Sequence, residues 1–160
     1  MSWSAFVVPL HACPADVLDW VREFDPTAVP EELPEPRPLP TVEQVLMSLR
    51  STGCHWDAWY KIVGEGSAIL PDRPESPSWD HYLGEVSITV EGSAERSAPV
   101  RLHDQVSGLS FRKPGEEGLL RAVTALVALG GPQLVFDTLG SGLVVGPDDS
   151  EEALAEKWLW

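Results

Sequence analysis

The stretch FRKPGEEGLLRAVTALVALGGPQLVFDTLGSGLVVG, residues 111–146, decides the fold. It is the longest apolar part of the chain, and it predicts a strand, a helix and a tight two-stranded hairpin in succession. Apolar side chains over 119–129 recur at mostly helical spacing, which predicts a largely buried helix. The Gly-Gly-Pro sequence at 130–132 ends that helix, because glycine suits the left-handed C-terminal position and proline cannot continue a helix. The apolar triplets 134–136 and 143–145 then flank a turn that contains glycine, as in a β-hairpin.

The N-terminal part of the chain predicts a strand followed by two helices. Residues 3–10 predict a short strand, and Pro9 indicates that this strand lies at a sheet edge or ends there. Pro14 suits the first position of the helix that follows. Thr41 and Gln44 match the capping box, in which each side chain satisfies a free backbone amide at the start of a second helix.

The middle of the chain predicts antiparallel strands. Residues 59–63 and 67–70 predict a hairpin across a Gly-Glu-Gly turn. Apolar and polar residues alternate over 86–90, which is the pattern of a half-buried strand. Further strands are expected around 100–102 and 109–111. A short helix near the C-terminus completes the predicted elements.

Length and composition favour one globular unit. At 160 residues the chain has the size of an ordinary domain. We therefore expect a single α+β domain over residues 1–160, with a mostly antiparallel sheet and about four helices packed on it. Two proline-rich surface loops are expected at about 25–40 and 71–80. The first holds six prolines and four acids in sixteen residues; since each proline removes an amide donor, it is interpreted as a stiff connector.

The most unusual global property is the formal net charge of −14. It argues against nucleic acid or an anionic membrane as a partner, because phosphate binding requires clustered Lys and Arg. It is compatible with a basic protein partner, and also with solubility alone. No segment approaches the roughly 20 apolar residues of a membrane span, and the N-terminus does not resemble a signal peptide. We therefore expect a soluble, cytoplasmic protein.

The sequence contains no specific signature of catalysis or metal binding. Cys13 and Cys54 are the only cysteines, and neither has a metal-ligand spacing. Cys54 is followed by His55 and, soon after, Asp57, but the members of a catalytic triad converge from separate elements. Buried packing is therefore the favoured interpretation of Cys54. We expect no enzymatic activity, no metal and no cofactor.

Three segments carry a resemblance to a known class of proteins. They are WSAFVVPL at 3–10, PADVLDWV at 14–21 and LLRAVTALVALGGPQLVFDTLGSGLVV at 119–145. Their order and character are similar to those of small bacterial immunity proteins of polymorphic toxin systems. The resemblance covers about the first 24 and the last 50 residues. It implies that the protein binds and neutralises a cognate toxin, which for nuclease toxins is often basic.

Candidate contacts for such a partner are carboxylates on loops beside an aromatic anchor, because a binding hot spot combines burial with charge. The loop at 71–80 offers three acids around one tryptophan, and the loop at 25–40 offers a second acidic group. The predicted partner-binding residues are Asp72, Glu75, Trp79, Asp80, Glu31, Glu32 and Glu35.

Two alternatives stay open. In the first, the protein is a small enzyme or ligand-binding domain whose site assembles from His55, Asp57, His81 and His103. In the other case it is a structural or assembly subunit with an exposed apolar patch at residues 158–160. Neither the oligomeric state nor the identity of the partner follows from the sequence.

Overall fold

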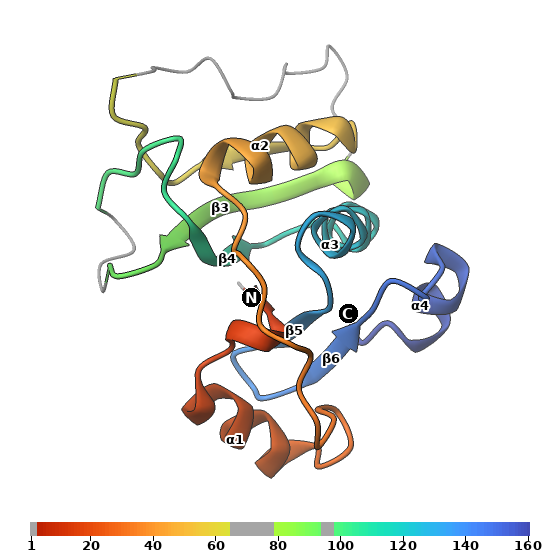
Figure 1. Cartoon of the computed structure of the whole chain (residues 1–160). Coiled ribbons are helices and arrows are strands. Elements are labelled where there is room, and N and C mark those ends of the chain that lie inside the picture. The colour runs from red at the N-terminus through yellow and green to blue at the C-terminus, as the bar shows by residue number, and fades with distance from the viewer. Residues whose placement is uncertain (1–2, 65–78, 94–97) are drawn as a thin grey trace.

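The computed structural model describes residues 3–64, 79–93 and 98–160 (Figure 1). Within these ranges the chain forms six strands, four α-helices and two short 3-10 turns. In chain order they are β1 (Ser4–Pro9), η1 (Leu10–Ala12), α1 (Ala15–Phe24), α2 (Val42–Ser51), β2 (His55–Ala58), η2 (Trp79–His81), β3 (Tyr82–Val90), β4 (Val106–Arg112), α3 (Glu116–Gly130), β5 (Gln133–Asp137), β6 (Gly142–Val145) and α4 (Glu151–Lys157). In these ranges, no helix is both long and apolar enough to span a membrane.

The strands form one mixed sheet in the order β2-β3-β4-β1-β5-β6. Every neighbouring pair is antiparallel except β2 and β3, which run parallel. The predicted α+β fold, with a mostly antiparallel sheet and about four helices, is therefore confirmed. β1 lies in the middle of the sheet between β4 and β5, so Pro9 marks the end of this strand and not a sheet edge.

The predicted arrangement of residues 111–146 is also confirmed. β4 leads into α3, whose first turn carries two glutamates, and Gly131 ends the helix with a φ of 84°. β5 and β6 then pair antiparallel as the expected hairpin. The predicted capping box closes the start of α2: the Gln44 N–H donates to Thr41 Oγ1 (3.2 Å), and the Thr41 N–H donates to Gln44 Oε1 (2.9 Å).

Two of the predicted strands are wrong. Residues 59–63 form no strand, although Ile62 makes an isolated bridge with Val100; the strand in this region is β2, four residues earlier. Residues 67–70 lie outside the described part of the chain. After Val100 the chain turns over residues 101–104, where the Arg101 N–H donates to the Asp104 carboxylate (2.8 Å) and the Asp104 N–H donates to the Arg101 carbonyl (3.1 Å). Backbone carbonyls in this turn accept hydrogen bonds from the first amide groups of α2. In a continuous strand these carbonyls would instead bond to a neighbouring strand.

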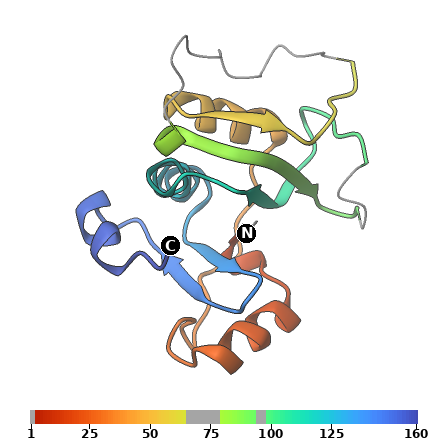
Figure 2. The same ribbon diagram turned by 180° about the vertical axis from the view of Figure 1, so that it is seen from behind.

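Alternate residues of the central strands belong to two separate cores, which places the helices on both faces of the sheet. Val7 of β1 and Val135 of β5 lie in the larger core with α2 and α3. Leu134 of β5 lies in the smaller core with Leu18 and Val21 of α1. Figures 1 and 2 show α2 and α3 beside β3 and β4, whereas α1 lies at the other end, beside β5 and β6. α1 therefore covers only part of the sheet face on which it lies.

Candidate partner-binding site

The structure separates the predicted partner-binding residues into two groups. Trp79 and Asp80 lie in η2, which leads directly into β3. Glu31, Glu32 and Glu35 are exposed in the chain that follows α1. Both ribbon views show the chain after α1 starting at the end of the molecule where α1 lies and then running up to α2. Asp72 and Glu75 lie outside the described residues, so their predicted role stays a prediction.

The turn η2 lies directly against the start of α3, and two glycines allow this contact. A Cβ atom on Gly115 would lie 2.2 Å from the Trp79 carbonyl oxygen, and one on Gly118 would lie 3.0 Å from the Asp80 carbonyl oxygen. The Gly115 N–H also donates to the Tyr82 carbonyl at 2.6 Å. Backbone packing at this distance requires the absence of a side chain. The two glycines therefore allow the backbone of Trp79 and Asp80 to lie against the start of α3.

Asp80 lines a pocket that the sequence analysis missed. We call it the acidic pocket, and its volume is about 320 Å³. Three elements contribute to it: η2, the first two turns of α3, and the last turn of α4 with the residue that follows. Its lining residues are Asp80, Glu116, Glu117, Leu120, Ala155 and Trp158. Three carboxylates and three apolar side chains thus line the pocket.

The three carboxylates of the acidic pocket differ in their partners. Glu117 Oε1 pairs with Arg121 (2.8 Å), one turn later on α3, and lies 3.4 Å from His81 Nε2. Asp80 and Glu116 have no ion-pair partner within the described ranges. Glu116 lies in the first turn of α3, where the helix dipole favours negative charge. The pocket therefore keeps negative charge that a cation could neutralise.

Trp79 lies beside this pocket and is mostly solvent-exposed, with 77% of its surface accessible. The edge of its ring contacts the Tyr82 ring, with 5.5 Å between the ring centroids and 83° between the planes. Tyr82 in turn stacks at a tilt on His55 and donates its hydroxyl to Asp57. These contacts support the tryptophan from one side and leave the rest of its ring accessible. An exposed tryptophan of this kind is typical of a binding anchor.

Part of the apolar lining of the pocket depends on the C-terminal helix. Ser150 caps α4 by accepting from the Ala153 N–H (3.1 Å), and the fully buried Leu154 anchors the helix on the core. Trp158 follows α4 and contacts the ring of Trp160, whose Nε1 donates to Asp137 (3.0 Å). Of residues 158–160 only Leu159 is largely exposed. A continuous exposed apolar patch at the C-terminus, the sign expected of an assembly subunit, is therefore not formed by these residues.

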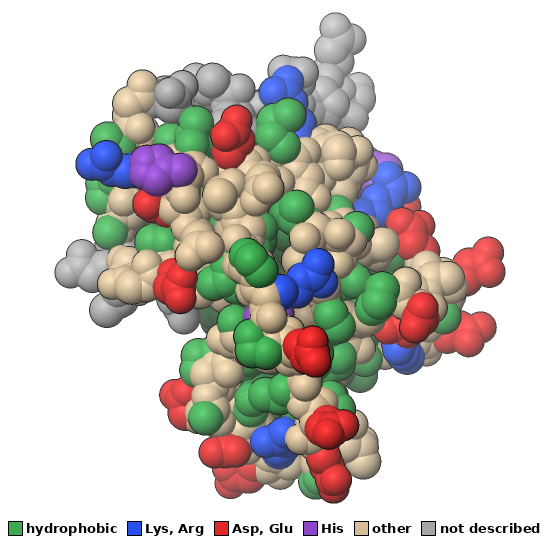
Figure 3. Space-filling view, in the orientation of Figure 1, with side chains coloured by type: hydrophobic (Ala, Val, Ile, Leu, Met, Phe, Trp, Pro, Cys, Tyr) green, Lys and Arg blue, Asp and Glu red, His purple; other side chains and the backbone are tan. Residues whose placement is uncertain are grey.

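The second acidic group belongs to an irregular surface segment. Residues 25–40 contain no helix or strand and connect α1 to α2. Arg22 donates to the Pro30 carbonyl (3.2 Å), and His11 Nε2 lies 3.1 Å from the Arg37 carbonyl oxygen. Figure 3 shows acidic side chains over the part of the surface that α1 and this segment occupy. Because the acidic pocket gathers carboxylates from two separate elements beside the exposed Trp79, it is the stronger candidate.

The histidines of the alternative site do not line the acidic pocket. His55 and Asp57 both contact Tyr82, His81 faces Glu117, and His103 is exposed in the turn before β4. Nowhere in the described ranges do three or more His, Cys, Asp or Glu side chains form a group that could hold a metal ion.

Both cysteines are buried. Burial raises the pKa of Cys13 to about 11, with a smaller contribution from Asp16, and burial also raises the pKa of Cys54. Because only the thiolate is nucleophilic, Cys13 should hold about 100-fold less thiolate at pH 8 than an ordinary thiol. We expect both thiols to react slowly with Ellman's reagent in the native protein and rapidly in 6 M guanidinium. Rapid reaction of either thiol in the native state would contradict this account.

Comparisons with protein-family models, with curated proteins and with solved structures found no match to this chain.

Proposed function

We propose that this protein is an immunity-type inhibitor that binds and neutralises a basic protein toxin through the acidic pocket. The observation that carries the proposal is the combination of Asp80 and Glu116, which have no ion-pair partner in the described residues, with the exposed ring of Trp79. Trp is enriched among binding hot spots, and the unpaired carboxylates beside it provide charge complementarity to a basic partner.

The chemistry of the pocket suits one long basic side chain of the partner. The aliphatic part of a lysine or arginine would pack on Leu120 and Trp158, while its charged head would reach the carboxylates at the rim. The net charge of −14 would accelerate the encounter with a basic surface through electrostatic steering. A nuclease toxin bound in this way would have its phosphate-binding surface occupied by carboxylates.

The fold is compatible with the resemblance to immunity proteins, from which we expected that the protein binds a toxin. The resemblance covers the two ends of the chain, and these ends are joined in one sheet. β1 pairs with β5 over five residues, from Ala5 with Asp137 to Pro9 with Gln133. The strand–helix unit at the N-terminus and the helix–hairpin unit at the C-terminus thus form a single structural unit, and this supports treating them as one pattern.

Co-expression with the products of neighbouring reading frames tests this function. We expect one of these products to arrest growth when expressed alone, and growth to recover when this protein is present. Recovery should fail for the triple variant Trp79→Ala, Asp80→Asn and Glu116→Gln at equal protein level. If none of these products is toxic, or if the triple variant still restores growth fully, the proposal is wrong.

A further inference from the structure

On the face that α1 partly covers, one part of the sheet has no helix over it among the described residues. On β3 and β4, Val86, Ile88 and Phe111 point into the larger core, so the residues between them point to the opposite face. Those residues include Ser87 and Ser110, which are only half-buried. The smaller core beneath α1 involves residues of β1, β5 and β6, and none of β3 or β4.

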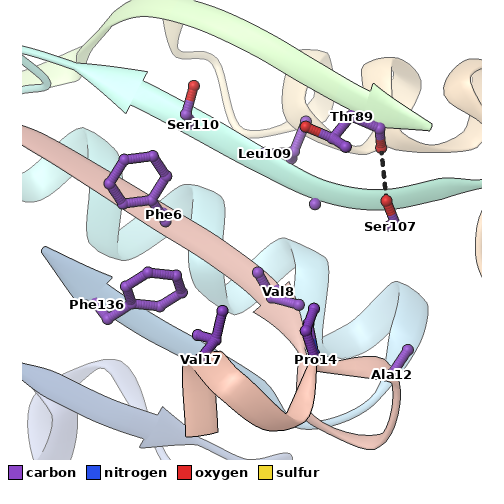
Figure 4. Close-up of a pocket in the computed structure, with 11 residues that line it drawn as sticks. Phe6, Val8, Ala12, Pro14, Val17, Thr89, Ser107, Leu109, Ser110 and Phe136 are labelled. Atoms are coloured by element: carbon purple, nitrogen blue, oxygen red, sulfur yellow. Dashed lines mark hydrogen bonds between the residues drawn. The ribbon is translucent and has the colours of Figure 1, made fainter. Parts of the chain in front are cut away.

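A hollow lies where the cover of α1 ends, and we call it the sheet hollow. Its volume is about 250 Å³. Figure 4 shows Phe6 and Phe136 side by side along it, with Val17 and Pro14 from the start of α1 at one side and β4 at the other. The two phenyl rings stack with 5.2 Å between centroids and 23° between planes. None of the residues that line the hollow carries a charge.

Hydroxyl groups supply the polar atoms of the sheet hollow. Ser107 donates to the Thr89 carbonyl at 3.2 Å, as the dashed line in Figure 4 shows. The Ser110 hydroxyl has no hydrogen-bond partner within the described part of the chain and can bind a ligand. A second hollow, of about 240 Å³, shares Phe6 and Ser110 with the first and continues across the sheet. Together they reach the size of a small-molecule site.

The second hollow ends at an exposed aromatic ring and a neutralised charge pair. Trp59 lines it and is 58% exposed, and Arg112 contacts Glu85 at 3.2 Å across β4 and β3. Because the arginine and the glutamate already balance each other, this end offers polar contacts without net charge. The overall charge of −14 would repel an anionic ligand. The sheet hollow also offers no carboxylate to pair with a cation, so its phenyl rings and hydroxyls suit an uncharged aromatic ligand best.

We propose that the sheet hollow and its extension bind a small uncharged aromatic molecule that carries hydrogen-bonding groups. The ring would contact Phe6 and Phe136, and the polar groups would meet the hydroxyl of Ser110 and the Glu85–Arg112 pair. The sheet hollow and its extension share no lining residue with the acidic pocket. The inference therefore does not depend on the proposed function.

Fluorescence titration with N-phenyl-1-naphthylamine, an uncharged aromatic probe whose emission rises in apolar surroundings, tests the proposal. We expect saturable binding of one molecule per chain. Ser110→Phe should fill the junction of the two hollows and weaken binding at least about 10-fold. Ser51→Phe, the same change at an exposed position on α2, should leave it unchanged. Asp80→Asn should also leave it unchanged.

A second variant keeps the test decisive if Ser110→Phe does not fold. Ala12 lines the sheet hollow and is exposed, so Ala12→Phe can close the mouth of the hollow without entering a core. It should weaken probe binding to a similar degree, with an unchanged circular dichroism spectrum. Absence of saturable binding, or equal affinity in wild type and Ala12→Phe, would overturn the proposal.

Discussion

Replacing Phe111 by alanine should lower the free energy of unfolding by about 3–5 kcal/mol, because the change removes a large side chain from a close-packed core. Phe111 is fully buried in the larger core. It lies on β4, between Ala5 of β1 and Val86 of β3, so it connects the two halves of the sheet. Urea denaturation followed by tryptophan fluorescence would measure the loss.

The matched control is Phe24→Ala at the end of α1. Phe24 is 60% exposed and contacts Trp20 edge-on, with 5.8 Å between the ring centroids. Because removal of this exposed ring leaves little cavity, Phe24→Ala should lower the free energy of unfolding by about 1 kcal/mol or less. Equal losses for the two phenylalanines would show that the described core is not the main source of stability.

Replacing Gly115 by alanine should move η2 away from α3. The new methyl group would lie 2.2 Å from the Trp79 carbonyl oxygen, a backbone atom that cannot turn aside as a flexible side chain can. Overpacking of this kind costs typically 1–3 kcal/mol. We expect reduced stability, altered emission of Trp79 and weaker binding of the partner, because both Trp79 and Asp80 would be displaced.

Gly146→Ala provides the control for this substitution. The nearest atom to a Cβ at Gly146 is Asp149 Oδ2 at 3.8 Å, an ordinary van der Waals distance. This variant should keep the stability of the wild type within about 0.5 kcal/mol, as surface substitutions usually do. If Gly115→Ala behaved like Gly146→Ala in stability, emission and binding, the close contact between η2 and α3 would not exist in solution.

The elements that the sequence predicted well are those encoded by local pattern. The helical spacing over 119–129 and the Gly-Gly-Pro stop determine α3 within a single segment, and the capping box of Thr41 and Gln44 fixes the start of α2. The hairpin of β5 and β6 likewise depends on residues close in sequence. Each of these signals acts over a few residues, so no knowledge of the rest of the fold was needed.

The incorrect predictions concern features that depend on contacts distant in sequence. The position of β2 follows from its parallel pairing with β3, more than twenty residues later, which periodicity cannot reveal. The acidic pocket assembles from η2, α3 and α4, so Asp80 was predicted as a site residue while Glu116 and Trp158 were not. One signal was present: glycines at 115 and 118 enclose two glutamates, and glycine at a helix start permits close backbone approach.

The affinity of the toxic partner for two double variants tests the central claim most directly. Isothermal titration calorimetry would compare two double variants. One combines Asp80→Asn and Glu116→Gln, and the other combines Glu43→Gln and Glu91→Gln. Both pairs remove two charges, but Glu43 and Glu91 are exposed on α2 and in the turn after β3, away from the acidic pocket. A third double variant, which combines Glu31→Gln and Glu32→Gln, tests the second acidic group.

The account predicts that the pocket variant loses at least about 100-fold in affinity, because an unpaired cationic side chain would remain at the interface. The Glu43 and Glu91 variant should lose less than about 3-fold, through weaker steering alone. Equal losses in the two variants, or a loss confined to the Glu31 and Glu32 variant, would contradict the claim that the acidic pocket binds the partner.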